Sequence, residues 1–215
     1  MVWMQRVVMP EILDQLDAGD ARAQRSMRDL RMINGLMRGE AWIVRELKKM
    51  SGVKRVVDLG AGDGCLGAAI LRQMPDMEVV CVDLKARPAE LDERVSWIQG
   101  DLFDCRAYDG HTVVVANLFL HHLSAGQLKR LGTLIGGVYG VLVAEPYRGK
   151  TSMFMGRCLF PLVNDVTRHD MMASIRAGFQ EDELGAMLGC HFKWHEQRSF
   201  FGGIRIKGMR KGRWR

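Results

Sequence analysis

The sequence predicts an α/β protein with a Rossmann-like, doubly wound sheet of seven strands. From Val53 onward, short apolar runs that end in Asp or Asn alternate with helical stretches, which is typical of successive β-α units. Residues 113–115 are three valines, apolar on both faces, as a central parallel strand covered by helices requires. We therefore expect a mostly parallel sheet with an antiparallel last strand.

The apolar periodicity places the individual elements. Helices are expected at residues 11–17, after an Asp20 cap, at 39–50 after a glycine break, and at 181–188. The expected strands are residues 55–59, 78–82, 95–99, 112–116, 139–144, 192–197 and 201–207.

The charge of the chain is unevenly distributed. The net charge is +6, but residues 205–215 hold six basic and no acidic residues, so the rest carries 25 basic and 25 acidic side chains. A neutral body lacks the dispersed basic face that phosphate tracking requires, which argues against nucleic acid as a partner. The basic segment at residues 205–215 is either a solvated terminus or a binding segment for an anionic partner.

The cysteines and the long uncharged run indicate in which cellular compartment the protein works. The five cysteines are odd in number and form no C-x-x-C pair, so we expect neither a disulfide framework nor a zinc site, and a reducing cytoplasm. Residues 110–128 carry no Asp, Glu, Lys or Arg, yet three histidines, an asparagine and a glutamine divide them into a strand and a helix start. No membrane span is expected.

A glycine turn follows the first expected strand. Residues 56–59 lead into Gly60-Ala61-Gly62-Asp63-Gly64, and an apolar helix begins near Leu66. Open α/β sheets bind ligands at such strand ends, where glycine lets a ligand approach the main chain. The turn reads G-x-G-x-G; Cys65 stands where a dinucleotide fingerprint would have its last glycine.

This turn resembles motif I of class I methyltransferases, and the resemblance covers about residues 52–145. It implies S-adenosylmethionine as the cofactor. An acid about twenty residues beyond the glycines, Asp83, would accept the ribose hydroxyls; a helix cap is its alternative role. By the same resemblance, Asp101 would hold the adenine amino group. The implied cofactor-binding residues are Asp58, Gly60, Ala61, Gly62, Gly64, Asp83, Leu84, Asp101, Leu102, Asn117 and Leu118.

Two adjacent histidines follow the fourth strand. Neighbours on a helix point about 100° apart, and no further ligand lies at metal spacing, so we expect no metal. His121 or His122 remains a candidate general base. Asn117 is followed by Leu-Phe-Leu rather than by the two prolines and aromatic residue of adenine N-methyltransferases. This moves the expected acceptor toward a small molecule.

Three further segments resemble small bacterial methyltransferases that modify lipophilic phenolic or polyketide products: residues 30–34, 166–170 and 174–179. In that interpretation the N-terminal helices and the insert after strand five form a lid. The cluster at residues 168–170 would serve the acceptor, with His169 as the preferred base and Arg168, Asp170 and Arg176 binding the substrate. Alternatively, Asp170 caps a helix and the arginines form surface ion pairs.

The insert is also rich in large apolar side chains. They would line a wall for a lipophilic acceptor or simply pack on the sheet, and they are Met153, Phe154, Met155, Leu159, Phe160 and Leu162.

One methyltransferase domain is therefore expected over residues 1–208, followed by a basic tail at 209–215. Its parts are the N-terminal helices (1–50), the cofactor-binding core (53–145), the lid insert (146–180) and the last helix and strands (181–208). The leading function is O-methylation of a phenolic, quinone or polyketide-type hydroxyl. An RNA or protein methyltransferase that uses the tail, or a non-catalytic binding protein, are the alternatives. The sequence does not determine the oligomeric state.

Overall fold

The structure, a computed structural model, describes residues 5–17 and 19–210. Its centre is one seven-stranded sheet with the order β3-β2-β1-β4-β5-β7-β6. The first five strands run parallel, and β7 is antiparallel to both β5 and β6, so the expected doubly wound sheet is confirmed. The strands are β1 (Arg55–Leu59), β2 (Glu78–Asp83), β3 (Ser96–Gln99), β4 (Thr112–Asn117), β5 (Gly140–Pro146), β6 (Phe192–Arg198) and β7 (Gly203–Arg210).

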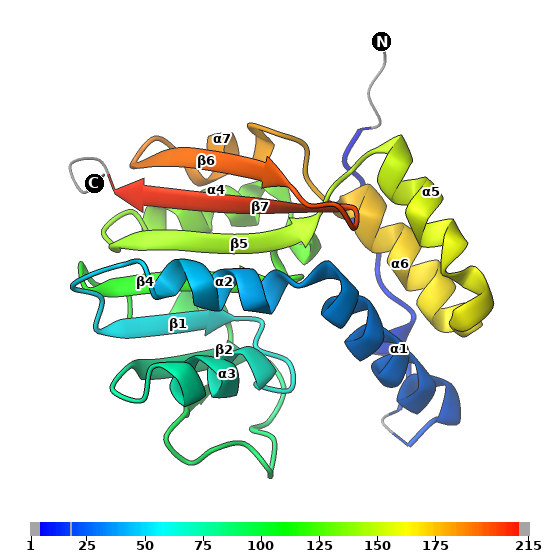
Figure 1. Cartoon of the computed structure of the whole chain (residues 1–215), viewed down its shortest axis with the longest axis horizontal. Coiled ribbons are helices and arrows are strands. Elements are labelled where there is room, and N and C mark those ends of the chain that lie inside the picture. The colour runs from blue at the N-terminus through cyan, green and yellow to red at the C-terminus, as the bar shows by residue number, and fades with distance from the viewer. Residues whose placement is uncertain (1–4, 18, 211–215) are drawn as a thin grey trace.

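Helices cover both faces of the sheet (Figure 1). On one face lie α2 (Gly39–Leu47) and α3 (Cys65–Gln73), and on the other α4 (Ala125–Leu134) and α7 (Glu183–Leu188). The valines of β4 divide between these layers, because side chains alternate along a strand: Val113 and Val115 pack with α2 and α3, and Val114 packs with α4 and α7. This two-sided burial explains the uninterrupted apolar run.

A separate helical layer stands beyond the carboxyl ends of the strands (Figure 1). It consists of α1 (Ala21–Met37), α5 (Lys150–Cys158) and α6 (Asp165–Ala177), and we call it the lid. The lid has its own core, in which Ile33 of α1 packs with Met153 of α5 and Met172 of α6. The α1 helix and the insert after β5 therefore form one unit, whereas the second expected N-terminal helix, α2, packs on the sheet and not in the lid.

Several element boundaries differ from expectation by one to three residues, and two differences concern the ends of the chain. The expected helix at 11–17 is only a 3-10 turn, η1 (Leu13–Gln15), because the backbone becomes extended at Leu16. The N–H groups of Ile12 and Leu13, at the start of the turn, bond to the Asp170 carboxylate. The last strand runs through Met209 to Arg210, so the placement of a tail from 209 onward was wrong. Met209 pairs with Gly140 and is buried, which holds this strand end. Residues 211–215 lie outside the described residues.

Candidate functional site: a cofactor and acceptor cavity

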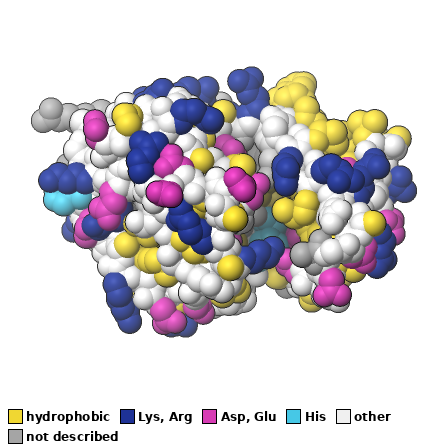
Figure 2. All heavy atoms as spheres, turned by 90° about the horizontal axis from the view of Figure 1, so that it is seen from below, with side chains coloured by type: hydrophobic (Ala, Val, Ile, Leu, Met, Phe, Trp, Pro, Cys, Tyr) yellow, Lys and Arg dark blue, Asp and Glu magenta, His cyan; other side chains and the backbone are white. Residues whose placement is uncertain are grey.

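One cavity of about 1200 Å³ lies at the carboxyl ends of the strands, between the sheet and the lid. Its walls come from the glycine turn after β1, from the ends of β2, β3 and β4, and from α1, α5 and α6. Figure 2 views the molecule from below and shows a face hollowed between these two parts. This is the edge at which open α/β sheets bind their ligands.

The glycine turn needs its glycines for conformation and for space. Gly60, Gly62 and Gly64 all have positive φ, at 66°, 59° and 75°. A Cβ on Gly60 would lie 2.1 Å from the Phe119 ring, whereas a Cβ on Gly62 would meet nothing within 4 Å. The main chain at Gly62 is therefore open to a ligand, and Gly60 lets Phe119 pack against the turn.

Asp83 stands at the end of β2 and faces the cavity. Its carboxylate accepts the N–H of Gly62 at 2.8 Å and the N–H of Lys85 at 2.8 Å. These bonds fix the carboxylate beside the glycine turn, and each of its oxygens keeps a second acceptor position for a hydroxyl. Asp83 thus links the two strand ends that the sequence motifs identified.

Most of the other residues expected at the cofactor also line the cavity. Asp101 caps a 3-10 turn, η2 (Leu102–Asp104), by accepting the Phe103 N–H at 2.9 Å, and Leu118 after β4 holds a left-handed backbone with φ 55°. Gly64 instead forms the N-cap of α3 and does not line the cavity. The lining members of the expected set are Asp58, Gly60, Ala61, Gly62, Asp83, Leu84, Asp101, Leu102, Asn117 and Leu118.

Three acceptor groups that line the cavity, the side chains of Asp58, Asn34 and Glu40, fit a cationic ligand. Asp58 is buried, and its Oδ2 has no hydrogen-bond partner among residues 5–17 and 19–210; the same holds for Oδ1 of Asn34 on α1. Burial, followed by the nearby Glu40 carboxylate, raises the pKa of Asp58 well above its usual range. Burial also raises the pKa of Glu40. A primary ammonium, such as the one on S-adenosylmethionine, would satisfy these acceptors, so the wall fits that cofactor.

A second polar region of the cavity, which we call its acceptor end, is built around His121. Its Nδ1 lies 2.7 Å from Oε2 of Glu145, and both side chains are buried. The other carboxylate oxygen of Glu145 accepts the N–H groups of Phe119 and Leu120 at 2.9 and 2.7 Å. Glu145 at the end of β5 therefore holds η3 (Leu120–His122), the turn after β4 that carries both histidines.

Glu11 brings a second carboxylate to this cluster from the far N-terminal segment. Its Oε1 lies 3.8 Å from Nε2 of His121 and accepts a hydrogen bond from the Ser174 hydroxyl of α6. The Arg6 guanidinium ties the same segment down by donating to three main-chain carbonyls, those of His121, Leu123 and Ala177.

The two histidines experience different electrostatic environments. Burial alone would lower the pKa of His121, but the carboxylates of Glu145 and Glu11 outweigh it and raise that pKa to about 9. Burial, followed by the charge of His121, lowers the pKa of His122. The two rings lie 4.2 Å apart between centroids at an angle of 34°, so the 3-10 turn brings adjacent histidines to one place.

The polar cluster at residues 168–170 lies on α6, away from the cavity lining. The His169 side chain is 44% exposed and bonds to Asp170, whose carboxylate anchors the N–H groups of Ile12 and Leu13. Arg168 donates to the Phe160 carbonyl, and Arg176 is exposed. The structure therefore does not bring these four predicted acceptor residues to the cavity.

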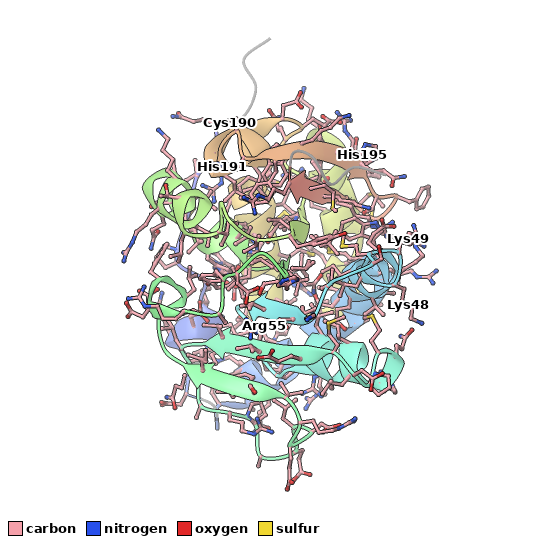
Figure 3. All side chains as sticks on the ribbon, turned by 90° about the vertical axis from the view of Figure 1, so that its left-hand side faces the viewer. Lys48, Lys49, Arg55, Cys190, His191 and His195 are labelled. Atoms are coloured by element: carbon pink, nitrogen blue, oxygen red, sulfur yellow. The ribbon has the colours of Figure 1, made fainter. Side chains whose placement is uncertain are left out.

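The remaining histidines lie at the other end of the molecule. Figure 3 looks onto the amino ends of the strands and labels His191 and His195 there, together with Arg55 at the start of β1. His111 immediately precedes β4 at the same edge. His121 and His122 are thus the two histidines that line the cavity among the described residues.

The apolar insert divides between three environments. Met155 and Leu159 line the cavity together with Leu30 and Leu36 of α1, and Leu159 also packs against the core of the lid. Met153 and Phe160 pack into the core of the lid instead, and Phe154 and Leu162 are exposed.

Two functional residues escaped the sequence interpretation. Glu145 had a usable signal, because an acid ends an otherwise apolar strand and such a buried carboxylate needs partners. Glu11 had none, since its neighbours in the site are more than a hundred positions away.

Comparisons with known proteins identify the family of the chain. The family of O-methyltransferase domains matches residues 15–142. An uncharacterized methyltransferase of Mycobacterium tuberculosis is 31% identical over 100 residues, which are 42% of this chain and 51% of that protein. The chain thus matches about half the length of the curated relatives.

Solved structures share the fold. The plantazolicin methyltransferase BamL, in complex with a triazolic desmethylPZN analog and SAH, has a TM-score of 0.72 at 12% identity and covers 92% of both chains. The related BpumL, with a monoazolic analog and SAH, has a TM-score of 0.68 at 11% identity and covers 89% of this chain and 91% of that one.

The sheet has the Rossmann-like fold of these methyltransferase structures. Within that fold class, the chain belongs to the family of O-methyltransferase domains. None of the helices among the described residues has the length and apolar character needed to cross a membrane.

Proposed function

We propose that the protein transfers a methyl group from S-adenosylmethionine to a hydroxyl of a lipophilic small molecule, of phenolic, quinone or polyketide type. One observation carries the proposal. The same cavity is lined by the residues expected to bind the cofactor, by the Glu11–His121–His122 cluster, and by apolar side chains of α1 and α5. Apolar pockets with a few convergent polar groups suit small organic ligands.

The cofactor supplies an activated methyl group on a sulfonium, so the protein mainly has to align the acceptor and exclude water. The lid serves both purposes. Its helix α1 contributes Asn34 to the cofactor end and Leu30 to the apolar wall, while α5 contributes Met155 and Leu159. We place the acceptor hydroxyl against the Glu11–His121–His122 cluster, which lines the same cavity as this wall.

We assign the contact with the acceptor oxygen to Glu11, His121 and His122 rather than to residues 168–170 and Arg176. The three side chains line the cavity, and His121 is fixed by its bond to Glu145. Such fixed orientation is what a side chain needs to position a reacting hydroxyl.

An RNA or protein acceptor gripped by the basic C-terminal run is not favoured. Two members of that run are used inside the fold: Lys207 bonds to Glu46 at 3.2 Å, and Arg205 lies 3.5 Å from the Met37 carbonyl. Both belong to β7 rather than to a free tail.

The test is methylation of a panel of lipophilic phenols, quinols and aromatic polyketides, with the product located by mass spectrometry. We expect transfer to oxygen, with at least a tenfold loss in kcat/KM for Leu159→Glu, which places a charge in the apolar wall. The exposed Leu162→Glu is the matched control and should keep its activity. Methylation of RNA or protein, with no turnover of any apolar hydroxyl, would contradict the proposal.

A further inference from the structure

We propose that Glu11, His121 and His122 bind one divalent transition-metal ion, with zinc as the ion that the donor set fits best. The ion would sit at the acceptor end of the cavity. Its catalytic role rests on the proposed O-methylation, but its binding does not. The following arguments come from the donor geometry, the unsatisfied ring nitrogen of His121 and the carboxylate behind that ring.

The three side chains supply two imidazoles and one carboxylate. One potential ligand atom from each lies within 4.8 Å of the others. Nε2 of His121 and Oε1 of Glu11 are 3.8 Å apart. Ligands in a tetrahedral zinc site are about 3.4 Å apart, as bond lengths of about 2.0–2.2 Å require. Binding therefore brings the ligand atoms together by at most about 1.4 Å, a movement that the partly exposed Glu11 and His122 can provide.

His121 presents an unsatisfied donor atom to this cluster. The residue is 3% exposed, and its Nε2 has no hydrogen-bond partner in the part of the chain that the structure describes. A buried polar atom without a partner is costly and indicates a missing ligand or ion. The direction of this atom toward Glu11 agrees with an ion between them.

The opposite side of the same ring is arranged as in a metal-binding histidine. Nδ1 lies 2.7 Å from the buried Glu145 carboxylate, which also accepts two main-chain N–H groups and so cannot turn away. With one proton on Nδ1 donated to Glu145, release of the second proton when an ion enters frees the Nε2 lone pair. Metal-binding histidines commonly donate their second N–H to a carboxylate in this manner, which fixes the ring and raises its basicity.

Three protein ligands leave at least one coordination position free, as in catalytic rather than structural zinc sites. Because Glu11, His121 and His122 all line the cavity, that position faces the space for the acceptor. An ion there would polarise the acceptor hydroxyl and lower its pKa, so that the oxygen reaches the methyl group as a better nucleophile. The two nearby carboxylates, Glu11 and Glu145, offset the charge of the ion.

Metal binding is tested first, without any methylation assay. Tag-free protein is freed of metal with a chelator and titrated with Zn²⁺ by calorimetry, and with Co²⁺ by visible absorption. We expect one equivalent bound by the wild type, with Co²⁺ bands of low coordination number, and at least tenfold weaker binding for Glu11→Gln and His122→Ala. His169→Ala is the matched control and should bind like the wild type. All five cysteines remain in every variant, so the differences isolate the cluster.

Equal affinity of the wild type and Glu11→Gln for both ions would overturn the site, as would Co²⁺ spectra that none of the substitutions changes. Those results would leave the alternative, in which His121 is a permanent cation held between the Glu145 and Glu11 carboxylates.

The catalytic role is tested separately by methylation with metal-free protein in chelator, followed by restoration with Zn²⁺, Co²⁺ or Mn²⁺. We expect at least a tenfold loss of turnover and its recovery with added ion, while affinity for S-adenosylmethionine stays constant. Full turnover in chelator would overturn the catalytic role and leave the proposed function intact. No turnover of any acceptor with or without ion, despite tight metal binding, would contradict the proposed function and leave the site intact.

Discussion

The two ends of the cavity are built in different ways. The cofactor end is made of turns that follow β1, β2 and β3 in chain order, and its central contact joins main chain to side chain, as between Gly62 and Asp83. The acceptor end joins Glu11, η3, Glu145 and α6, which are far apart in the sequence, through buried polar side chains. The first depends on backbone geometry and the second on a charged network.

This difference separates binding from stability. A substitution at the cofactor end should remove contacts to a ligand and leave the fold intact, because the turn is held by the strands on either side. A substitution in the buried network should leave charged or polar partners unsatisfied and so destabilise the protein itself. The predictions below test this division in order of expected effect.

Replacement of Glu145 should have the largest effect. Glu145→Ala removes the acceptor of two main-chain N–H groups and of the buried His121 ring, and breaking a buried pair of this kind costs about 3–5 kcal/mol in the free energy of unfolding. Denaturant unfolding measures it. Glu145→Gln keeps an acceptor for the N–H groups and should lose clearly less. A loss under about 1 kcal/mol for the alanine variant would show that the network does not hold this end.

Replacement of Asp83 should change binding instead. Asp83→Ala removes the carboxylate expected at the ribose hydroxyls, and hydrogen bonds to a charged group contribute about 1.5–3 kcal/mol, or roughly a 10- to 150-fold change in Kd. Calorimetry with S-adenosylmethionine and S-adenosylhomocysteine measures the change, and thermal melting without ligand serves as the control. Unchanged affinity in the folded variant would remove Asp83 from the cofactor site.

Replacement of Asp58 should stabilise the ligand-free protein and weaken its binding of the cofactor. Its pKa is raised by burial and by the nearby Glu40, so the folded protein holds this proton more tightly than the unfolded chain does. The contribution of Asp58 to stability is therefore complete below about pH 4 and is lost as pH rises through the raised pKa. Asp58→Asn removes that loss, and we expect the ligand-free protein to melt about 2–4 °C higher at neutral pH, as a gain near 1 kcal/mol would give.

The same variant should bind S-adenosylmethionine more weakly, because an amide replaces the carboxylate that faces the cofactor ammonium. Asp63→Asn is the control, since it removes an exposed carboxylate from the same turn and should move the melting temperature less. A lower melting temperature for Asp58→Asn at pH 7 would mean that the buried carboxylate has a partner it stabilises.

More residues of the cofactor end than of the acceptor end could be predicted from the sequence, and the reason is physical. The carboxyl ends of parallel strands meet at one edge, so Gly62, Asp83 and Asp101 could be brought together from strand order alone. Local spacing was also the basis on which no metal was expected: His121 and His122 were treated as neighbours on a helix, whereas η3 is a 3-10 turn in which their ring centroids lie 4.2 Å apart.

The residues of the acceptor end depend on tertiary packing, which the sequence pattern did not reveal. The polar residues of α6 looked like an acceptor site because they are dense in sequence, yet the helix turns its apolar face and Ser174 to the cavity and its Asp170 to the N-terminal segment. Helical periodicity shows that a helix has two faces but not which of its neighbours each face meets.

Replacement of His169 should have the smallest effect and decides between these two views of the acceptor site. The side chain is 44% exposed, bonds to Asp170 and does not line the cavity. His169→Ala should therefore change turnover less than twofold and the free energy of unfolding by no more than about 0.5 kcal/mol, as is usual for exposed positions. His122→Ala should lower turnover at least tenfold, with cofactor affinity retained in both variants. Steady-state kinetics and calorimetry make the comparison. If His169→Ala lost turnover while it still bound S-adenosylmethionine, the acceptor would lie on the other side of α6, and the buried network would serve the fold alone.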